Sequence, residues 1–241
     1  MFLLETVECI RTRRSIKKFK PDSVPDELIE KVLEAARWSP SAHNFQVCRY
    51  VVVRDGETRE KLRLIAARSV RDSARARGDW TFEDYKQDVK YLPSTGRDQS
   101  SDEWIKWRME KEREEPFDLS WPYQYISQAP VIIVICANRY APYLFRGNKV
   151  SWDESMKDAF CAAENILLAA HDLGLGATLN DRVTSGKYIK ELRRILEIPD
   201  DYTPVTVICM GYSDVPELKM DKMPLEELVF YERFGQKEKP A

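Results

Sequence analysis

The sequence predicts an α+β fold. Two continuous apolar runs of strand length, residues 131–138 (VIIVICAN) and 205–211 (VTVICMG), indicate strands that are buried on both faces. Segments with helical spacing surround these runs, but helices and strands do not alternate as regularly as in a doubly wound parallel sheet. The spacing suits antiparallel pairing instead, so we expect helices packed on a mainly antiparallel sheet.

The first third of the chain predicts two helices before the first strand. Residues 3–11 have the apolar spacing of a short amphipathic helix. Pro25 introduces a second helix over residues 26–39, because apolar residues recur there at i, i+3 and i+4. The β-branched run at residues 50–53 predicts a strand, and helical spacing returns over residues 57–75.

Residues 78–125 differ from the rest of the chain in composition. Helix-forming residues occur there in two pieces, with breaks at residues 93–96 and at Pro116. Four of the six tryptophans lie in this segment, at Trp80, Trp104, Trp107 and Trp121. Two interpretations stay open: the aromatic rings pack on the body of the protein, or they face a flat organic substrate.

The second half of the chain contains the longest predicted helix, residues 152–173, whose several alanines allow close helix approach. Gly174 and Gly176 end this helix and begin a tight connection to the segment ATLND. Another helix is expected over residues 187–196, before Pro199. His171, near the end of the long helix, is interpreted as a surface or interface residue rather than a catalytic base.

Composition excludes several classes of function. The chain has 241 residues, 43% of them hydrophobic, and a formal net charge of -2, which argues against general nucleic-acid binding. No apolar run reaches the roughly 18 residues of a membrane-spanning helix. The N-terminus carries acidic residues where a signal peptide has its apolar centre. We therefore expect a cytoplasmic protein that contacts neither membrane nor nucleic acid.

The cysteines and histidines indicate no metal site. Cysteine occurs five times, without CxxC spacing, and histidine only twice. The cysteines are expected to be reduced and to behave as small buried hydrophobic residues. Their positions are Cys9, Cys48, Cys136, Cys161 and Cys209.

The N-terminal run RTRRSIKKF, residues 11–19, is the strongest candidate for ligand binding. It places Arg13, Arg14, Ser15 and Lys17 close together, with no acidic residue between Glu8 and Asp22. Arginine binds phosphate oxygens in a bidentate manner, and a neighbouring hydroxyl or backbone N–H completes the shell. The run therefore indicates an anion site, with a solvated basic turn as the alternative.

A second polar stretch, PSAHNFQ at residues 40–46, follows the helix that Pro40 ends. Ser41, Asn44 and Gln46 offer hydroxyl and amide groups at a fixed place. From RRSIK to the strand CRYVVV, the order and spacing resemble the FMN-dependent nitroreductase family, which has an RRSxR-type motif and then PSxxNxQPW before a strand. Here Val47 and Cys48 replace the usual Pro-Trp pair.

The resemblance extends to the rest of the chain. NILLAA and GLG at residues 165–176 match the end of the family's central helix, and KMDKMPLEELV resembles its C-terminal motif. It implies a three-layer α-β-α sandwich over residues 1–241, with two FMN sites at a homodimer interface built on residues 152–173. It assigns FMN contacts to Arg13, Arg14, Ser15, Lys17, Ser41, Asn44, Gln46, Thr178, Leu179, Asn180 and Lys222.

The same resemblance suggests a substrate region. Residues 78–125 lie where the family inserts its variable segment, so they are expected to form a helical lid. The C-terminal motif also looks like the iodotyrosine deiodinase-type branch, which holds its substrate with an acid, a tyrosine and a lysine. Side chains of these types in the lid, with one tryptophan, are candidate substrate contacts: Glu83, Tyr85, Lys86 and Trp107.

The activity that the resemblance implies is an FMN-dependent, ping-pong oxidoreduction. NADH or NADPH would reduce the flavin, which would then reduce a small aromatic, nitro, quinone or halogenated acceptor. Two alternatives stay open. One is a flavin-binding storage or sensor protein without turnover, and the other is a helical interaction module without a cofactor.

Overall fold

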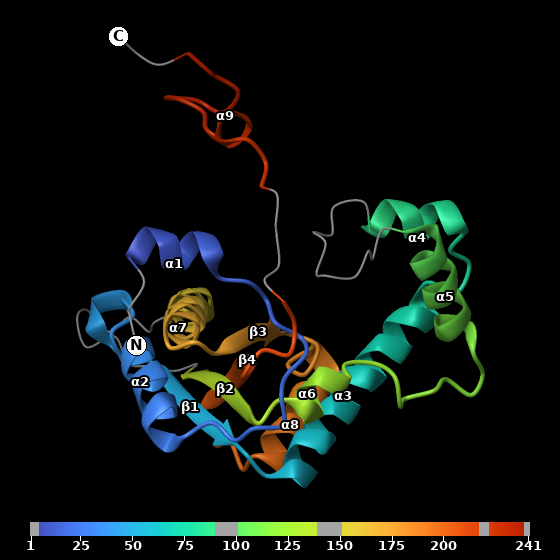
Figure 1. The fold of residues 1–241 in the computed structure, drawn as a ribbon, viewed down its shortest axis with the longest axis horizontal. Coiled ribbons are helices and arrows are strands. Elements are labelled where there is room, and N and C mark those ends of the chain that lie inside the picture. The colour runs from blue at the N-terminus through green and yellow to red at the C-terminus, as the bar shows by residue number, and fades with distance from the viewer. Residues whose placement is uncertain (1–4, 90–100, 139–150, 217–221, 239–241) are drawn as a thin grey trace.

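The computed structural model describes residues 5–89, 101–138, 151–216 and 222–238. These residues form α-helices, short 3₁₀ helices (η) and strands, and Figure 1 shows how they are arranged. Their bounds are α1 Thr6–Thr12, α2 Asp26–Arg37, η1 Ala42–Asn44, β1 Cys48–Val53, α3 Gly56–Ala76, α4 Phe82–Val89, α5 Asp102–Arg113, α6 Gln124–Gln128, β2 Val131–Asn138, α7 Trp152–Asp172, β3 Gly176–Asn180, η2 Gly186–Tyr188, α8 Ile189–Ile195, β4 Tyr202–Gly211 and α9 Leu225–Leu228.

The four strands form one sheet in the order β1-β2-β4-β3, with every neighbouring pair antiparallel. The two apolar runs predicted as buried strands are the central pair, β2 and β4. Almost every side chain of β2 is buried, because helices cover both faces of the sheet. The α+β prediction is therefore confirmed, and the sheet among the described residues is wholly antiparallel.

Two hydrophobic cores lie on opposite faces of this sheet. Ile133 and Ile135 of β2 pack with α2 and α7, whereas Ile132 and Val134 pack with α3, α6 and α8. This alternation is the period of two that a strand imposes on its side chains. Helices accordingly lie above and below the sheet, as Figure 1 shows.

The strand β4 begins three residues before the predicted strand, at Tyr202. It includes Pro204, which has no N–H to donate to a neighbouring strand. The register between β2 and β4 shifts at this point, because Ile135 pairs with Thr206 and Cys136 pairs with Pro204. This irregularity lets the strand continue through the proline.

The long helix α7 agrees with the prediction over residues 152–173 and has strong signals at both ends. Ser151 and Glu154 form a reciprocal capping box at its start. At its end Gly174 adopts a left-handed φ of 79°. The N–H groups of Gly174 and Leu175 donate to the carbonyls of His171 and Ala170, the two hydrogen bonds of a Schellman motif.

The predicted helical segment at residues 78–125 forms α4 and α5, and the predicted break at residues 93–96 lies outside the described residues. Glu112 of α5 is buried and accepts hydrogen bonds from Arg77, Arg108 and the Tyr85 hydroxyl. Burial alone would raise the pKa of Glu112, but the hydrogen bonds from the two arginines outweigh it and lower this pKa. One carboxylate thus connects α4 and α5 with the end of α3.

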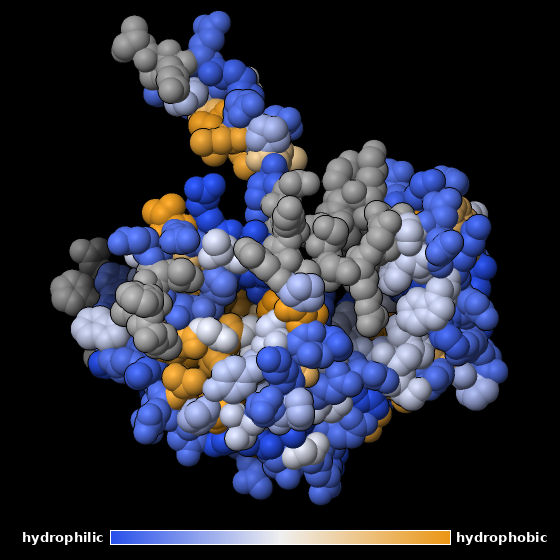
Figure 2. Space-filling model, viewed as in Figure 1, coloured by the Kyte–Doolittle hydropathy of each residue, from blue (hydrophilic) through white to orange (hydrophobic). Residues whose placement is uncertain are grey.

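The C-terminal segment with α9 lies apart from the body of the molecule (Figure 1). Its short helix is held to the residues that follow, since the Lys237 ammonium donates to the Val229 carbonyl at 3.2 Å. Figure 2 shows apolar atoms on its surface, and another apolar patch over α1. The exposed apolar side chains of the segment are Met223, Leu225, Leu228 and Phe234.

None of the helices that the structure describes is both long and apolar enough to span a bilayer. Within the same residues no group of three histidine, cysteine, aspartate or glutamate side chains could hold a metal ion. All five cysteines are free thiols, and three are buried as expected. Cys161 corrects that expectation, because it is exposed on α7.

Candidate functional site

The N-terminal motif lies against the edge strand β3. The main-chain N–H of Ile16 donates to the Ala177 carbonyl at 3.1 Å, and Ser15 forms an isolated parallel bridge with Ala177. A β-carbon on Gly176 would stand 2.8 Å from side-chain atoms of Ile16. Glycine is therefore required here for the two segments to approach, and the structure unites two motifs that are some 160 residues apart.

The strand geometry of β3 presents main-chain groups at the same edge. In a strand, the backbone groups of residues i and i+2 point to the same side. The Ala177 carbonyl faces the N-terminal segment, so the N–H and C=O of Leu179 face this outer edge as well. The side chains of Thr178 and Asn180 are buried, with 2% and 4% exposure. At these predicted cofactor positions the backbone, rather than the side chains of Thr178 and Asn180, is thus available at the edge.

A pocket of about 420 Å³ opens beside β3. Three predicted cofactor residues contribute to its wall: Lys17, Leu179 and Asn180. The Lys17 ammonium lies 6.0 Å from the centre of the Tyr125 ring. Although Lys17 keeps exposed surface, desolvation by the surrounding protein lowers the pKa of its ammonium group.

The buried end of this pocket is fixed by Asn180. Its side-chain nitrogen donates to the Tyr125 hydroxyl at 2.7 Å. Its side-chain oxygen accepts from the N–H groups of Arg182 and Val183, at 3.0 and 3.2 Å. Burial raises the pKa of Tyr125, so this phenol stays protonated near neutral pH. Asn180 therefore holds the wall of the pocket and the turn after β3 in one arrangement.

Arg13 and Arg14 follow the end of α1 and are both half-buried. The Arg13 guanidinium is 3.8 Å from the Glu164 carboxylate, a distance typical of a weak ion pair near the surface. Arg14 donates to the carbonyls of Arg11 and Arg13, at 2.7 and 2.8 Å. The cationic cluster is therefore organised close to the β3 edge, next to Ser15.

His171 has a structural role in this structure, in agreement with its sequence-based interpretation. Its Nε2 lies 2.8 Å from the Thr12 hydroxyl, which itself donates to the Glu8 carbonyl at 2.7 Å. Because that hydroxyl has one proton, Nε2 must donate to it. Burial, and then the charges of Arg13 and Arg14, lower the pKa of His171, so the neutral ring ties α1 to α7.

The loop at residues 41–46 is held in an unusual backbone conformation. His43, Asn44 and Gln46 have positive φ angles of 50°, 58° and 50°. The Ala42 N–H donates to Asp158 of α7 at 3.1 Å, and the Gln46 N–H donates to the Ser41 hydroxyl at 3.0 Å. Non-glycine residues with positive φ are uncommon, and they often mark functional sites.

This loop lies at the other edge of the sheet. It leads into β1, whereas the cationic motif lies along β3, and these are the two edge strands. Three strand spacings separate them, about 14 Å. One chain therefore does not bring Ser41, Asn44 and Gln46 together with the pocket at Lys17.

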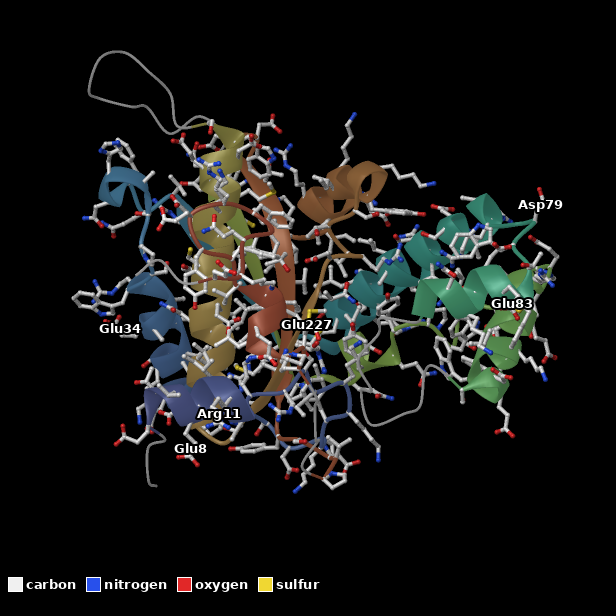
Figure 3. All side chains as sticks on the ribbon, turned by 90° about the horizontal axis from the view of Figure 1, so that it is seen from above. Glu8, Arg11, Glu34, Asp79, Glu83 and Glu227 are labelled. Atoms are coloured by element: carbon white, nitrogen blue, oxygen red, sulfur yellow. The ribbon has the colours of Figure 1, made fainter. Side chains whose placement is uncertain are left out.

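The other predicted residues also lie away from the pocket. Lys222 is exposed and stands three residues before α9, which lies apart from the body (Figure 1). Figure 3 shows Glu83 on α4, at the side of the molecule remote from Arg11 of α1. Lys86 pairs with Asp102 of the neighbouring helix α5 at 3.5 Å.

Tyr85 and Trp107 have different environments within the same helical pair. Tyr85 is 2% exposed and its hydroxyl donates to Glu112 at 2.9 Å. The ring is therefore part of the core between α4 and α5, and a contact between Tyr85 and a substrate stays a prediction. Trp107 is 41% exposed and packs edge-on against Trp121, with 5.2 Å between ring centres.

Several residues that line the pocket were not identified from the sequence: Tyr123, Tyr125, Asp181, Arg182 and Ser185. The aromatic composition of residues 78–125 was a signal for the two tyrosines, which lie at its end. The sequence contains no comparable signal for Arg182, whose position depends on a hydrogen bond from its Nη1 to Ser73, 2.8 Å away on α3.

Comparison with known proteins gives consistent matches over most of the chain. The Nitroreductase family model matches residues 10–212. A protein of Methanothermobacter thermautotrophicus, provisionally named NADH dehydrogenase/NAD(P)H nitroreductase, is 27% identical over 210 residues, which are 87% of this chain and 78% of that protein.

Two solved structures share the fold. NADPH:FMN oxidoreductase from Vibrio harveyi, complexed with NAD+, has a TM-score of 0.62 and 18% identity, and the match covers 96% of this chain and 78% of that one. Iodotyrosine deiodinase bound to FMN and 3-iodo-L-tyrosine has a TM-score of 0.60 and 18% identity, with coverage of 91% and 96%. At such identities the likeness concerns the arrangement of helices and strands.

Proposed function

Because the chain belongs to the nitroreductase family, we propose that it is an FMN-dependent oxidoreductase that uses NADH or NADPH to reduce a small organic acceptor. The observation that carries this proposal is the contact between Ile16 and Ala177, which joins the cationic motif to the edge of β3. The names of the matched proteins support it, since they mention nitroreduction, FMN and NAD+.

The residues at this edge fit the chemistry of FMN. A phosphate needs cations and N–H donors, which Arg13, Arg14 and Ser15 offer. A flavin ring needs donors near its polar edge, which the Leu179 backbone and the Lys17 ammonium offer. When bound, FMN would supply the redox chemistry, because flavins accept a hydride and pass electrons on.

The protein's part in the reaction is to bind and orient the electron donor and the acceptor, and to keep other molecules out of the pocket. Tyr125 and Leu179 form a partly apolar wall of the pocket, and Lys17 places a positive charge beside it. We propose that donor and acceptor use this pocket in turn, so that turnover follows ping-pong kinetics. The acceptor would be aromatic, nitro, quinone or halogenated, since such molecules are flat enough to lie along this wall.

We further propose a homodimer in which each flavin site is shared. The loop with Ser41, Asn44 and Gln46 leads into β1, whereas the cationic motif of the same chain lies along β3, and about 14 Å of sheet separates these two edge strands. A two-fold arrangement would let one chain's loop complete the other chain's site. Exposed apolar side chains on α1, α7 and the C-terminal segment would be covered: Val7, Ile10, Phe160, Met223, Leu225, Leu228 and Phe234.

The proposal also assigns roles to the helical segment at residues 78–125 and to Lys222. Residues 1–241 would form one domain, with the helical segment at residues 78–125 as a lid. Tyr123 and Tyr125, at the end of this segment, line the pocket and support that role. Glu83, Lys86 and Trp107 would contact substrate only if the lid moves, and Lys222 would reach a phosphate only within the dimer. The five free thiols suit a cytoplasmic location.

An absorption spectrum, followed by anaerobic addition of NADH or NADPH, tests the proposal. The purified protein should be yellow, and its flavin bands should bleach on addition of one of these donors. A yellow protein that does not bleach would favour a flavin-binding protein without turnover. A colourless protein that cannot be reconstituted with FMN would refute the assignment.

A further inference from the structure

The turn after β3 contains an arginine that forms no ion pair with a carboxylate in the part of the chain that the structure describes. Arg182 is half-buried and lines the pocket beside β3. Its Nη1 donates to the Ser73 hydroxyl at 2.8 Å, and its backbone is fixed by Asn180. Within the described ranges, no carboxylate lies at ion-pair distance from its guanidinium group.

The arginines of the neighbouring helix α3 provide a comparison for the environment of Arg182. Of the five arginines of α3, the helix that carries Ser73, Arg59 donates to the main-chain carbonyl of Ser127. The other four each pair with a carboxylate: Arg63, Arg68, Arg71 and Arg75. Arg182 packs against the same helix but is held by a neutral hydroxyl. A neutral partner fixes the orientation of a guanidinium group without neutralising its charge, so further donors stay available to a ligand.

The other charged residues that line the pocket also favour an anionic ligand. Lys17 adds a second cation to its wall. Asp181 is the one carboxylate among the described residues that line the pocket, and it accepts a hydrogen bond from the Thr206 hydroxyl at 2.7 Å. Two cations thus face one carboxylate, beside the rings of Tyr123 and Tyr125. The pocket therefore favours a flat ligand that carries a negative charge.

We propose that Arg182 is the counter-ion for an anionic group on the ligand that shares this pocket with FMN, which makes it a determinant of specificity. The anion would be a carboxylate on an aromatic acceptor or a phosphate of the nicotinamide donor. Lys17, Leu179 and Asn180 are the predicted cofactor contacts, so Arg182 and Ser185 remain for the second ligand. This inference rests on the proposed function and adds the charge of the ligand to it.

The test compares acids with amides of the same shape. The FMN-loaded wild-type protein should reduce 4-nitrobenzoate with a higher kcat/KM than 4-nitrobenzamide. In Arg182→Gln the ratio of the two kcat/KM values should fall at least tenfold, which is the range of a lost charge-assisted contact. Arg182→Lys keeps the charge and should retain part of the ratio. Arg194→Gln, at an exposed arginine on α8 outside this pocket, should leave the ratio as it is.

A second experiment identifies whether the anionic group belongs to the nicotinamide donor or to the acceptor. The rates of anaerobic flavin reduction by NADPH and NADH are compared in the wild type and Arg182→Gln. A fall in the NADPH:NADH ratio assigns Arg182 to the donor's additional phosphate, and a fall in the acid:amide ratio assigns it to the acceptor. If neither ratio changes by more than twofold, or if both substrates of each pair lose activity equally, the inference is wrong.

A binding measurement separates this inference from the proposed function. Benzoate and benzamide are titrated by calorimetry into the protein as purified, with and without Arg182→Gln. Benzoate should bind more tightly, and the variant should lose that preference, whether or not turnover is found. An equal affinity for both ligands in the wild type, together with an NADPH:NADH ratio that Arg182→Gln does not change, would overturn the inference, whereas absence of flavin reduction would overturn only the proposed function.

Discussion

The main-chain N–H of Ile16 donates a hydrogen bond to the Ala177 carbonyl at 3.1 Å. This single contact aligns the cationic N-terminal motif with the strand that borders the pocket. It depends on close approach, because the neighbouring residue of β3 is Gly176, and a β-carbon there would stand 2.8 Å from Ile16. In the proposed function, binding of the FMN phosphate would therefore be coupled to the position of β3 through this contact.

Substitution Gly176→Ala should weaken FMN binding. The added methyl group meets the branched carbons of Ile16 close to its backbone, so the N-terminal segment has to move away from β3. Overpacking of this kind costs typically about 1–3 kcal/mol. We expect a similar loss of free energy of unfolding and at least a fivefold rise in the Kd for FMN, measured by fluorescence titration.

The matched control is Gly186→Ala. Apart from Gly186 and its two chain neighbours, no described atom lies within 4 Å of a β-carbon at Gly186, so this alanine should leave the Kd for FMN unchanged. A wild-type Kd in Gly176→Ala would contradict the coupling between Ile16 and β3.

Substitution Arg13→Ala should raise the Kd for FMN at least tenfold. A hydrogen bond to a charged group contributes about 1.5–3 kcal/mol, and the competing contact with Glu164 is long and partly solvated. Arg11→Ala removes an exposed cation on α1 and provides the control, with less than a twofold change expected. Equal Kd values for the two variants would count against the phosphate assignment.

The elements that the sequence predicted well have long periodic patterns or continuous apolar runs. The helix α7 has both a capping signal and Gly174, and β2 and β4 are mostly apolar. The five-residue helix α6 was missed because it is too short to show a period. The start of β4 was misplaced because a register shift, which the sequence does not reveal, accommodates Pro204.

The site was predictable where a motif is local and not where distant segments create it. Lys17 and Leu179, which were both predicted to contact the cofactor, line one pocket, whereas Arg182 is fixed by Ser73, 109 positions earlier. Tyr85 was assigned to substrate from its residue type. Its partner Glu112, 27 positions later, makes it part of a buried cluster that the sequence did not indicate. Residue type alone does not distinguish these roles.

Substitution Glu112→Gln should destabilise the α4–α5 pair. The carboxylate is 2% exposed and is the shared partner of Arg77 and Arg108. Removal of its charge breaks a buried ion pair with each of two partly buried guanidinium groups, and breaking such a pair costs about 3–5 kcal/mol. We expect faster hydrogen exchange in α4 and α5 and a lower free energy of unfolding in urea.

Glu110→Gln is the control for this prediction, because Glu110 is exposed on the same helix. Its free energy of unfolding should stay within about 0.5 kcal/mol of the wild-type value. If Glu112→Gln were as stable as Glu110→Gln, the buried cluster would not hold the helical pair.

The contact between His171 and Thr12 should make stability depend on pH. Burial, followed by the charges of Arg13 and Arg14, lowers the pKa of His171 in the folded chain below the value of about 6.5 that an unfolded chain has. The unfolded chain then binds more protons at mildly acidic pH, so stability present above pH 6.5 is lost as the pH falls through the folded-state pKa. His171→Gln keeps an N–H donor for Thr12 but does not titrate. Thermal midpoints measured from pH 7.5 to 5 should therefore fall more steeply for the wild type than for His171→Gln, and parallel curves would show that this histidine does not contribute to the pH dependence.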